Sequence, residues 1–244
     1  MKILQFSDWH VYYTPLVSIL RLMETLSAEQ PDVIICCGDY TGTKKAEICV
    51  ATIVKLIRDV FPNTPFGTVL GNHDYWLIEK KKIPTNQTKQ LNNIIKIFQQ
   101  NNIHFFDKDG VMDVAGVQFV GHSGWYCNPK PPTNDAGWMS QFQVNTHSLM
   151  SSTANDETGK NIELLQPNKK TIYVSHFSVN DDGVNDWKGG FATFGGNPNI
   201  GKILQENYNC TMFLHGHSHM LKRGPLNYEC GSDYDKPSYK IWEA

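Results

Sequence analysis

The chain has no long apolar run and no excess of basic charge. No stretch approaches the roughly 18 apolar residues of a membrane span. The N-terminal segment MKILQFSDWH lacks the longer apolar region and the small-residue cleavage site of a secretory signal. A formal net charge of −2 gives no general attraction to nucleic acid or to an anionic membrane. The sequence therefore predicts a cytoplasmic protein without a membrane partner.

Paired cysteines are also absent. The six cysteines are scattered without a C-x-x-C spacing, at Cys36, Cys37, Cys49, Cys127, Cys210 and Cys230. Cys36 and Cys37 sit in an apolar run, where buried free thiols are the expected state. A thiolate zinc site is therefore not expected, and free thiols agree with a cytoplasmic location.

No repeat, low-complexity tract or linker divides the 244 residues, so we expect a single domain over 1–244. Strand and helix patterns alternate from the start. Strands are predicted at 2–8, 32–40, 66–74, 103–107, 110–114, 116–122, 173–177 and 210–217, and helices at 15–30, 44–60, 87–101 and 199–207. Two or three short strands should follow, ending at 238–243. The irregular segments 123–168 and 181–198 are typical of functional loops.

Metal-ligand residue types stand at the ends of five predicted strands. They are Asp8 and His10, Asp39, Asn72 with His73 and Asp74, His176, and His217 with His219. Loops at the carboxyl ends of strands in an alternating sheet converge on one crevice. Carboxylate, amide and imidazole ligands without thiolate suit Mn, Fe or Zn, and there are more of them than one ion can use. The sequence therefore predicts two divalent metal ions per chain.

The motifs D-x-H (Asp8–His10), G-D (Gly38–Asp39), G-N-H-D (Gly71–Asp74), a lone histidine (His176) and G-H-x-H (Gly216–His219) follow one another in this order. In order and spacing they resemble the calcineurin-like metallophosphoesterases. The resemblance implies an α/β fold in which a β-sandwich of two mixed sheets is flanked by helices, in four layers. It also implies a two-metal site along one edge of the sandwich.

Carried over residue by residue, the resemblance assigns two ligand sets. One metal goes to Asp8, His10, Asp39 and His219, and the other to Asp39, Asn72, His176 and His217, with Asp39 bridging. His73 then matches the catalytic histidine, and Asp74 is the residue expected to orient it. His215 lies outside the pattern and is interpreted as structural, and His122 follows an apolar strand without a clear assignment.

The resemblance implies a metal-dependent phosphoesterase. Two cations about 3.5–4 Å apart would activate a bridging hydroxide, and His73 would act as general acid on the leaving group. A small-molecule or nucleotide phosphodiester or phosphomonoester is the favoured substrate, and Mn is the favoured activating metal. Trp125 and Trp187, in the two irregular segments, are candidate substrate contacts.

Other functions stay open at this point. A nuclease acting on nucleic acid is one alternative, although the chain lacks the basic surface expected for it. A non-catalytic scaffold on the same fold is another, but it would be expected to lose ligands that are all present here. A structural zinc site at residues 213–220 would leave Asp8, Asp39 and Asn72 unexplained.

Overall fold

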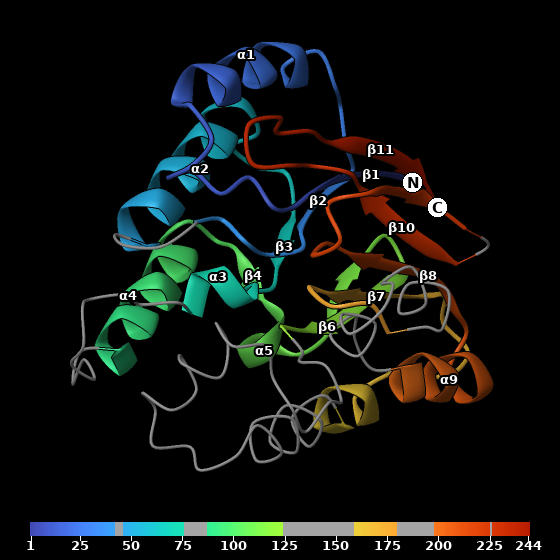
Figure 1. The fold of residues 1–244 in the computed structure, drawn as a ribbon. Helices are drawn as coiled ribbons and strands as arrows, with labels where there is room; N and C mark the ends of the chain where they lie inside the picture. The colour runs from blue at the N-terminus through green and yellow to red at the C-terminus, as the bar shows by residue number, and fades with distance from the viewer. Residues whose placement is uncertain (42–45, 76–86, 124–158, 180–197, 225) are drawn as a thin grey trace, which may run out of the picture.

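Strands that are buried on both faces alternate with amphipathic helices through the first half of the chain. A computed structural model describes residues 1–41, 46–75, 87–123, 159–179, 198–224 and 226–244 (Figure 1). The first strands are β1 (Lys2–Phe6), β2 (Val33–Cys36) and β3 (Phe66–Thr68), and the helices between and after them are α1 (Leu16–Leu26), α2 (Ala46–Val60), the short α3 (Asn72–Tyr75) and α4 (Gln87–Gln100). Burial on both faces is the usual condition of parallel strands covered by helices.

The first sheet has five strands in the order β11-β1-β2-β3-β4, where β4 is His104–Phe105 and β11 is Lys240–Glu243. The strands β1 to β4 run parallel, with Leu4 opposite Ile34. β11 joins the edge antiparallel to β1, with Trp242 opposite Ile3. The end of the chain thus completes the sheet that its beginning starts.

The second sheet has six strands in the order β5-β6-β7-β8-β10-β9. Their bounds are β5 Met112–Val114, β6 Val117–His122, β7 Thr171–Ser175, β8 Cys210–His215, β9 Leu221–Arg223 and β10 Asn227–Cys230. β6, β7, β8 and β10 run parallel, and β5 and β9 are antiparallel edge strands. Both sheets are therefore mixed, as the resemblance implied.

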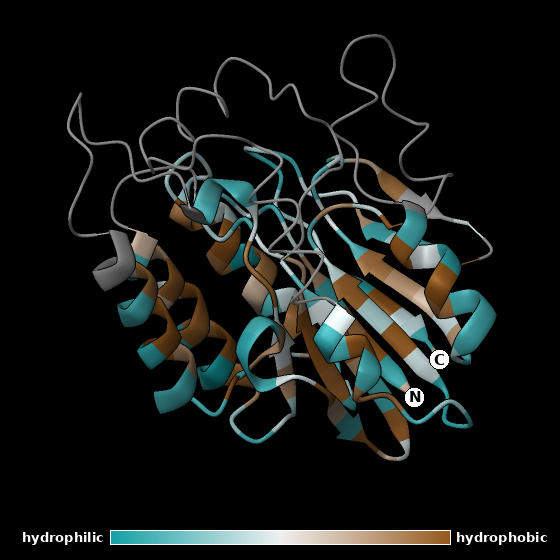
Figure 2. Ribbon diagram, turned by 90° about the horizontal axis from the view of Figure 1, so that it is seen from below, coloured by the Kyte–Doolittle hydropathy of each residue, from teal (hydrophilic) through white to brown (hydrophobic). Residues whose placement is uncertain are grey.

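Three apolar cores separate four layers of structure. The first lies between α1, α2, α4 and the outer face of the first sheet, and Leu4 and Ile34 belong to it. The second lies between the sheets and contains Ile3 and Val174. The third lies between the second sheet and α9 (Pro198–Asn207), and includes Leu204. Figure 2 shows the hydrophobic residues of the strands between helices whose outer surfaces are hydrophilic. The predicted four-layer sandwich is confirmed.

The prediction of a strand over 103–107 was wrong in its second half. β4 ends at Phe105 and a short helix, α5 (Phe106–Asp109), follows. The Asp109 carboxylate accepts a hydrogen bond from the Phe105 amide at 2.9 Å, and Gly110, with φ of 74°, ends the helix. The apolar pattern instead reflects the buried ring of Phe106, which packs between the two sheets.

Candidate metal centre

Both sheets contribute side chains to one edge of the sandwich. Asp8 and His10 follow β1, Asp39 follows β2 and Asn72 begins α3 after β3. From the second sheet, His176 follows β7, and His217 and His219 follow β8. The contacts described below link all seven predicted metal ligands in one buried or half-buried cluster.

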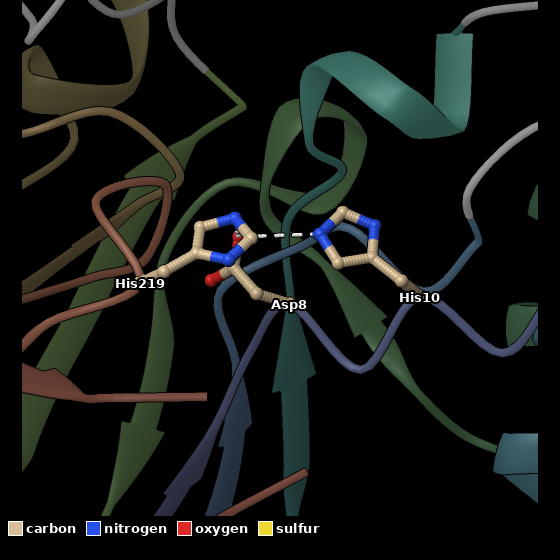
Figure 3. Close-up of side chains that lie close together, drawn as sticks. All are labelled: Asp8, His10 and His219. Carbon is tan, nitrogen blue, oxygen red and sulfur yellow. Dashed lines mark ion pairs between the residues drawn. The ribbon is translucent and has the colours of Figure 1, made fainter. Parts of the chain in front are cut away.

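Asp8 lies between the rings of His10 and His219 (Figure 3). Its Oδ1 is 3.4 Å from His219 Nε2 and 4.0 Å from His10 Nε2. The carboxylate also accepts hydrogen bonds from the His217 amide, at 3.1 Å and 3.2 Å, and from Ser7 Oγ at 2.5 Å. Asp8, His10 and His219 offer donor atoms that all lie within 4.8 Å of one another, which is close enough to surround one ion.

Asp39 occupies the middle of the cluster. Its Oδ2 is 3.7 Å from His10 Nε2 and 3.4 Å from His176 Nε2, so it faces one histidine from each predicted ligand set. Its Oδ1 accepts a hydrogen bond from the His73 backbone amide at 2.9 Å. A second group of donor atoms within 4.8 Å consists of Asp8, Asp39 and His176.

Asn72 and His217 complete the side of the cluster around His176. Asn72 Oδ1 is 3.0 Å from His176 Nε2, and the His217 ring centre is 5.1 Å from that of His176. His217 also packs on the ring of Phe177 at 4.4 Å. These residues are the predicted second ligand set together with Asp39.

Three histidines have one ring nitrogen held by a neighbour, which aims the other at the carboxylates. His10 Nδ1 lies 3.4 Å from the Thr41 carbonyl, and His176 Nδ1 lies 2.8 Å from the Cys37 carbonyl. His219 Nδ1 lies 3.3 Å from Asp233 Oδ1. A hydrogen bond to Nδ1 fixes the tautomer and orientation of a metal-binding imidazole, so Nε2 is the donor atom available to a metal.

His73 lies beside the cluster and is half-buried. Its ring centre is 4.6 Å from that of His10, and its donor atom groups with those of His10 and Asp39 within 4.8 Å. Asp74 is buried beneath it, and its two oxygens accept hydrogen bonds from the Thr41 and Gly71 amides at 3.0 Å and 2.9 Å. Asp74 thus braces the two loops that carry Asp39 and His73.

The backbone of the site is strained where the ligands stand. Seven non-glycine residues of the described chain have positive φ, and five of them are predicted ligands: Asp8, His10, Asp39, His217 and His219. Glycines make room for the carboxylates. A Cβ on Gly71 would lie 2.6 Å from the Asp39 amide nitrogen and closer still to its Oδ1, and one on Gly216 would press on Asp8 Oδ2.

Burial and neighbouring charges set the protonation of the site in opposite directions. Burial lowers the pKa of His10 to about 4 and that of His217 well below its usual range. Burial disfavours a charged His176 as well, but the adjacent Asp39 carboxylate outweighs it and raises the pKa of His176 to about 10. Burial, followed by repulsion from Asp39, raises the pKa of Asp74 to about 8.

The residues present fit a bound cation. Among the described residues, no hydrogen-bond partner reaches His10 Nε2 or Asp39 Oδ2, although both atoms are fully buried. A buried polar atom left in this state is costly, and a metal would satisfy both. The donors are nitrogen and oxygen atoms without thiolate, as Mn, Fe and Zn accept.

The motifs did not predict two residues of the site. Tyr234, between β10 and β11, stacks on His10 with ring centres 4.5 Å apart, and burial raises the pKa of its hydroxyl to about 12. Its neighbour Asp233 holds His219. Neither follows a parallel strand, so nothing in the strand-end pattern marks them.

Two other predicted histidines lie in buried ion pairs. His215 Nδ1 is 3.4 Å from Glu229 Oε2, a contact that agrees with a structural role. His122 Nε2 is 3.2 Å from Asp107 Oδ1. Trp125 and Trp187, the candidate substrate contacts, lie outside the described residues.

A helix-flanked double-sheet sandwich with nitrogen and oxygen ligands gathered at the common edge of its sheets defines a metal-dependent hydrolase. The model of the family described as calcineurin-like phosphoesterase matches residues 1–221, and the chain therefore belongs to the calcineurin-like phosphoesterases.

Similar proteins agree with this family. A subunit of the nuclease SbcCD from Staphylococcus saprophyticus is 23% identical over 192 residues, which are 73% of this chain and 46% of that protein. This chain thus spans less than half the length of that relative. The crystal structure of phosphopantetheinyl hydrolase (PptH) from Mycobacterium tuberculosis superposes with a TM-score of 0.69 at 14% identity, covering 94% of this chain and 88% of the other. TT1561 of Thermus thermophilus gives 0.55 at 11%, covering 95% and 89%. These two likenesses concern the fold.

No helix among the described residues is long and apolar enough to cross a bilayer.

Proposed function

We propose that the protein hydrolyses a phosphodiester or phosphomonoester of a small molecule or nucleotide, with two divalent metal ions per chain. Asp8, His10, Asp39 and His219 would hold one ion, and Asp39, Asn72, His176 and His217 the other. When bound, the ions would supply an activated water and neutralise the phosphoryl oxygens. Manganese is the metal that we expect to support activity.

The position of Asp39 Oδ2 is the observation that carries this proposal. It faces His10 at 3.7 Å and His176 at 3.4 Å, one histidine from each proposed ligand set. A carboxylate oxygen between two such imidazoles, with no hydrogen-bond partner among the described residues, is suited to a shared ligand. The fixed Nδ1 atoms of His10 and His176 direct their Nε2 atoms to the same place.

His73 is the proposed general acid. An ester oxygen leaves poorly as an alkoxide, so proton transfer from a positioned imidazole accelerates its departure. Asp74 would act on His73 through the backbone, because its carboxylate ties Gly71 to Thr41 and so holds the loop on which His73 stands. Trp125 and Trp187 remain our candidates for contact with the leaving group.

The test is a hydrolysis screen on protein stripped of metal and reloaded with Mn²⁺, Fe²⁺ or Zn²⁺. The substrates are bis-p-nitrophenyl phosphate, p-nitrophenyl phosphate, cyclic nucleotides and dinucleotide polyphosphates, and the ratio of the first two separates diesterase from monoesterase activity. Asp39→Asn is the matched control, since it keeps the size of the side chain and removes its charge. Two bound metals without hydrolysis of any ester would refute the proposal.

A nuclease activity is the second candidate, and the likeness to a subunit of the nuclease SbcCD favours it. The net charge of −2 weighs against it, because nucleic-acid binding draws on clustered basic residues. Mn²⁺-dependent cleavage of single- or double-stranded DNA at a rate above that of the small diesters would make it the leading function.

The proposed compartment is the cytoplasm. Cys36, Cys37, Cys49, Cys210 and Cys230 are free thiols and all are buried, a state that reducing compartments maintain. Expression of a tagged full-length protein followed by fractionation tests this location.

A further inference from the structure

Three tyrosines from two distant segments gather beside the candidate metal centre. Tyr12 and Tyr13 follow β1, and Tyr234 stands between β10 and β11. The Tyr13 ring meets Tyr234 edge-on at 5.7 Å and Tyr12 at 5.6 Å. Tyr12, Tyr13 and Tyr234, here called the tyrosine shelf, are exposed to 59%, 49% and 42%. Large aromatic side chains held together in the open are available to a ligand.

The tyrosine shelf is continuous with the candidate centre. Tyr234 stacks on His10 at 4.5 Å with an interplanar angle of 26°, and its ring centre is 5.0 Å from that of His219. The ring of His73, the proposed general acid, is 6.3 Å away. A phosphate ester that reaches both the metal ligands and His73 therefore has the tyrosine shelf next to it.

Several hydrogen bonds hold Tyr234 in this place. Asp233 and Lys236 exchange two backbone hydrogen bonds, at 3.2 Å and 2.9 Å, and close a tight turn around it. Thr14 Oγ1 donates to the Tyr234 carbonyl, and the buried Trp9 donates from Nε1 to the Ser238 carbonyl at 2.8 Å. The turn is thus fastened to the segment that carries Tyr12 and Tyr13, so the three rings keep their relative positions without a ligand.

Packing alone accounts for only part of this arrangement. A ring that served to cover His10 would need no exposed companions, whereas Tyr12 and Tyr13 are about half exposed and continue the surface away from the ligands. Asp233 is exposed beside them and adds negative charge to that of Asp8 and Asp39. An anionic ligand would therefore be held by the metals, and the tyrosine shelf would contact an uncharged part.

We propose that the tyrosine shelf stacks the planar base of a nucleotide whose phosphate is held at the metal centre. This rests on the proposed function and deepens it, because it selects nucleotides among the small phosphate esters. Stacking suits any base, since every base has a π-face. Tyr234 also lies beyond residues 1–221 that match the family, so the contact belongs to this chain rather than to the shared motifs.

The test compares two ligands that differ only in the base. Adenosine 5′-monophosphate and ribose 5-phosphate share the phosphate and the ribose, and calorimetry on the Mn²⁺-loaded full chain gives the Kd of each. We expect the nucleotide to bind about tenfold more tightly. Tyr234→Leu and Tyr13→Leu should each remove most of this preference, while Tyr234→Phe should keep it. Tyr208→Leu, at the end of α9 against the third core, is the control and should change neither Kd.

The outcomes separate this inference from the proposed function. If neither ligand binds the metal-loaded protein, both are overturned. If both bind equally, or if the preference survives in Tyr234→Leu and in Tyr13→Leu, the base is not held by the tyrosine shelf and only this inference falls. Metal content is measured for each variant, because Tyr234 touches His10. Should Tyr234→Leu lose metal, Tyr13→Leu decides, since the described contacts of its ring are with Tyr12 and Tyr234.

Discussion

His73 contributes its backbone amide to Asp39 and leaves its ring beside the proposed ligands. His73→Ala keeps that amide, so we expect both metals to stay bound while the rate falls by roughly 10²–10⁴, the usual effect of a positioned general acid. An alkyl ester should lose most, and a p-nitrophenyl ester, which leaves well unprotonated, should lose less. Metal analysis combined with kinetics on both esters measures this.

Asp39→Ala is the contrasting variant at this site. It removes the carboxylate between His10 and His176, and metal occupancy itself should fall. A metal-depleted His73→Ala would instead assign that residue to metal binding, since its donor atom groups with those of His10 and Asp39. Equal losses on both esters would remove the general-acid role.

Gly71 offers a second test at the scale of one residue. Gly71→Ala would place a Cβ 2.6 Å from the Asp39 amide nitrogen and against its carboxylate. Because backbone and carboxylate must shift together, we expect at least tenfold weaker metal binding, a change of about 1.4 kcal/mol, measured by calorimetry. Gly159→Ala, with open space around the new methyl group, is the control. Unchanged affinity would show that the Asp39 loop yields without cost.

At the scale of elements, Gln5 of β1 links the two sheets. Its Oε1 accepts from Trp242 Nε1 at 2.6 Å, and its Nε2 donates to the carbonyls of His215 at 2.9 Å and Tyr228 at 3.2 Å. Gln5→Leu would leave a buried donor and two buried carbonyls without these partners, so we expect a loss of about 2–4 kcal/mol in the free energy of unfolding. Urea denaturation of the metal-free protein measures it.

The matched control for Gln5 is Gln99→Leu, on the exposed face of α4. It makes the same chemical change where no buried partner depends on the side chain. A loss at Gln5 no larger than the loss at Gln99 would mean that the second core compensates for the missing hydrogen bonds.

Elements with their own periodicity were predictable from the sequence. The predicted helices 44–60 and 87–101 correspond to α2 and α4 within two residues at each end. The pairing of β11 with β1 was not, because it joins the two ends of the chain through contacts that leave no local pattern. At 103–107 an apolar run was read as strand throughout, although a buried residue such as Phe106 gives the same local pattern in a helix.

The candidate site was predictable in part for the same reason. Strand ends and residue types marked the ligands, because the carboxyl ends of parallel strands meet at one edge. The second sheet and the shared role of Asp39 came from the resemblance, not from spacing. Tyr234 could not be found in this way, since its position depends on the turn at 233–236 and on its anchor to Thr14.

At the scale of the whole molecule, a metal at this site would join the two sheets. Asp8, Asp39 and Asn72 come from the first sheet, and His176, His217 and His219 from the second. Thorough chelation should therefore abolish hydrolysis and also lower the melting temperature. At a metal concentration of a hundred times Kd the added stability is about 2.7 kcal/mol, readable by calorimetry with and without Mn²⁺. Hydrolysis that survives chelation would refute the two-metal proposal.

Activity should also fall as the pH drops below about 6.5, the ordinary pKa of histidine. Imidazoles bind metal only when neutral, so protons compete for His10, His176, His217 and His219. The competition is strongest at His176, whose ring Asp39 already favours in the charged form. Raising the Mn²⁺ concentration should restore activity at low pH. A loss that added metal does not reverse would place its cause outside the ligands.

The strained backbone of the site bears on how the chain would change under different selection. Five proposed ligands adopt left-handed conformations that cost roughly 1 kcal/mol or more each, and glycine adopts them freely. Aspartate and histidine are among the few other residues that enter this region, and they are also metal ligands. A library screened for heat resistance alone, without metal, should therefore drift towards glycine at Asp8, His10, Asp39, His217 and His219. The catalytic edge would disappear while both sheets persisted.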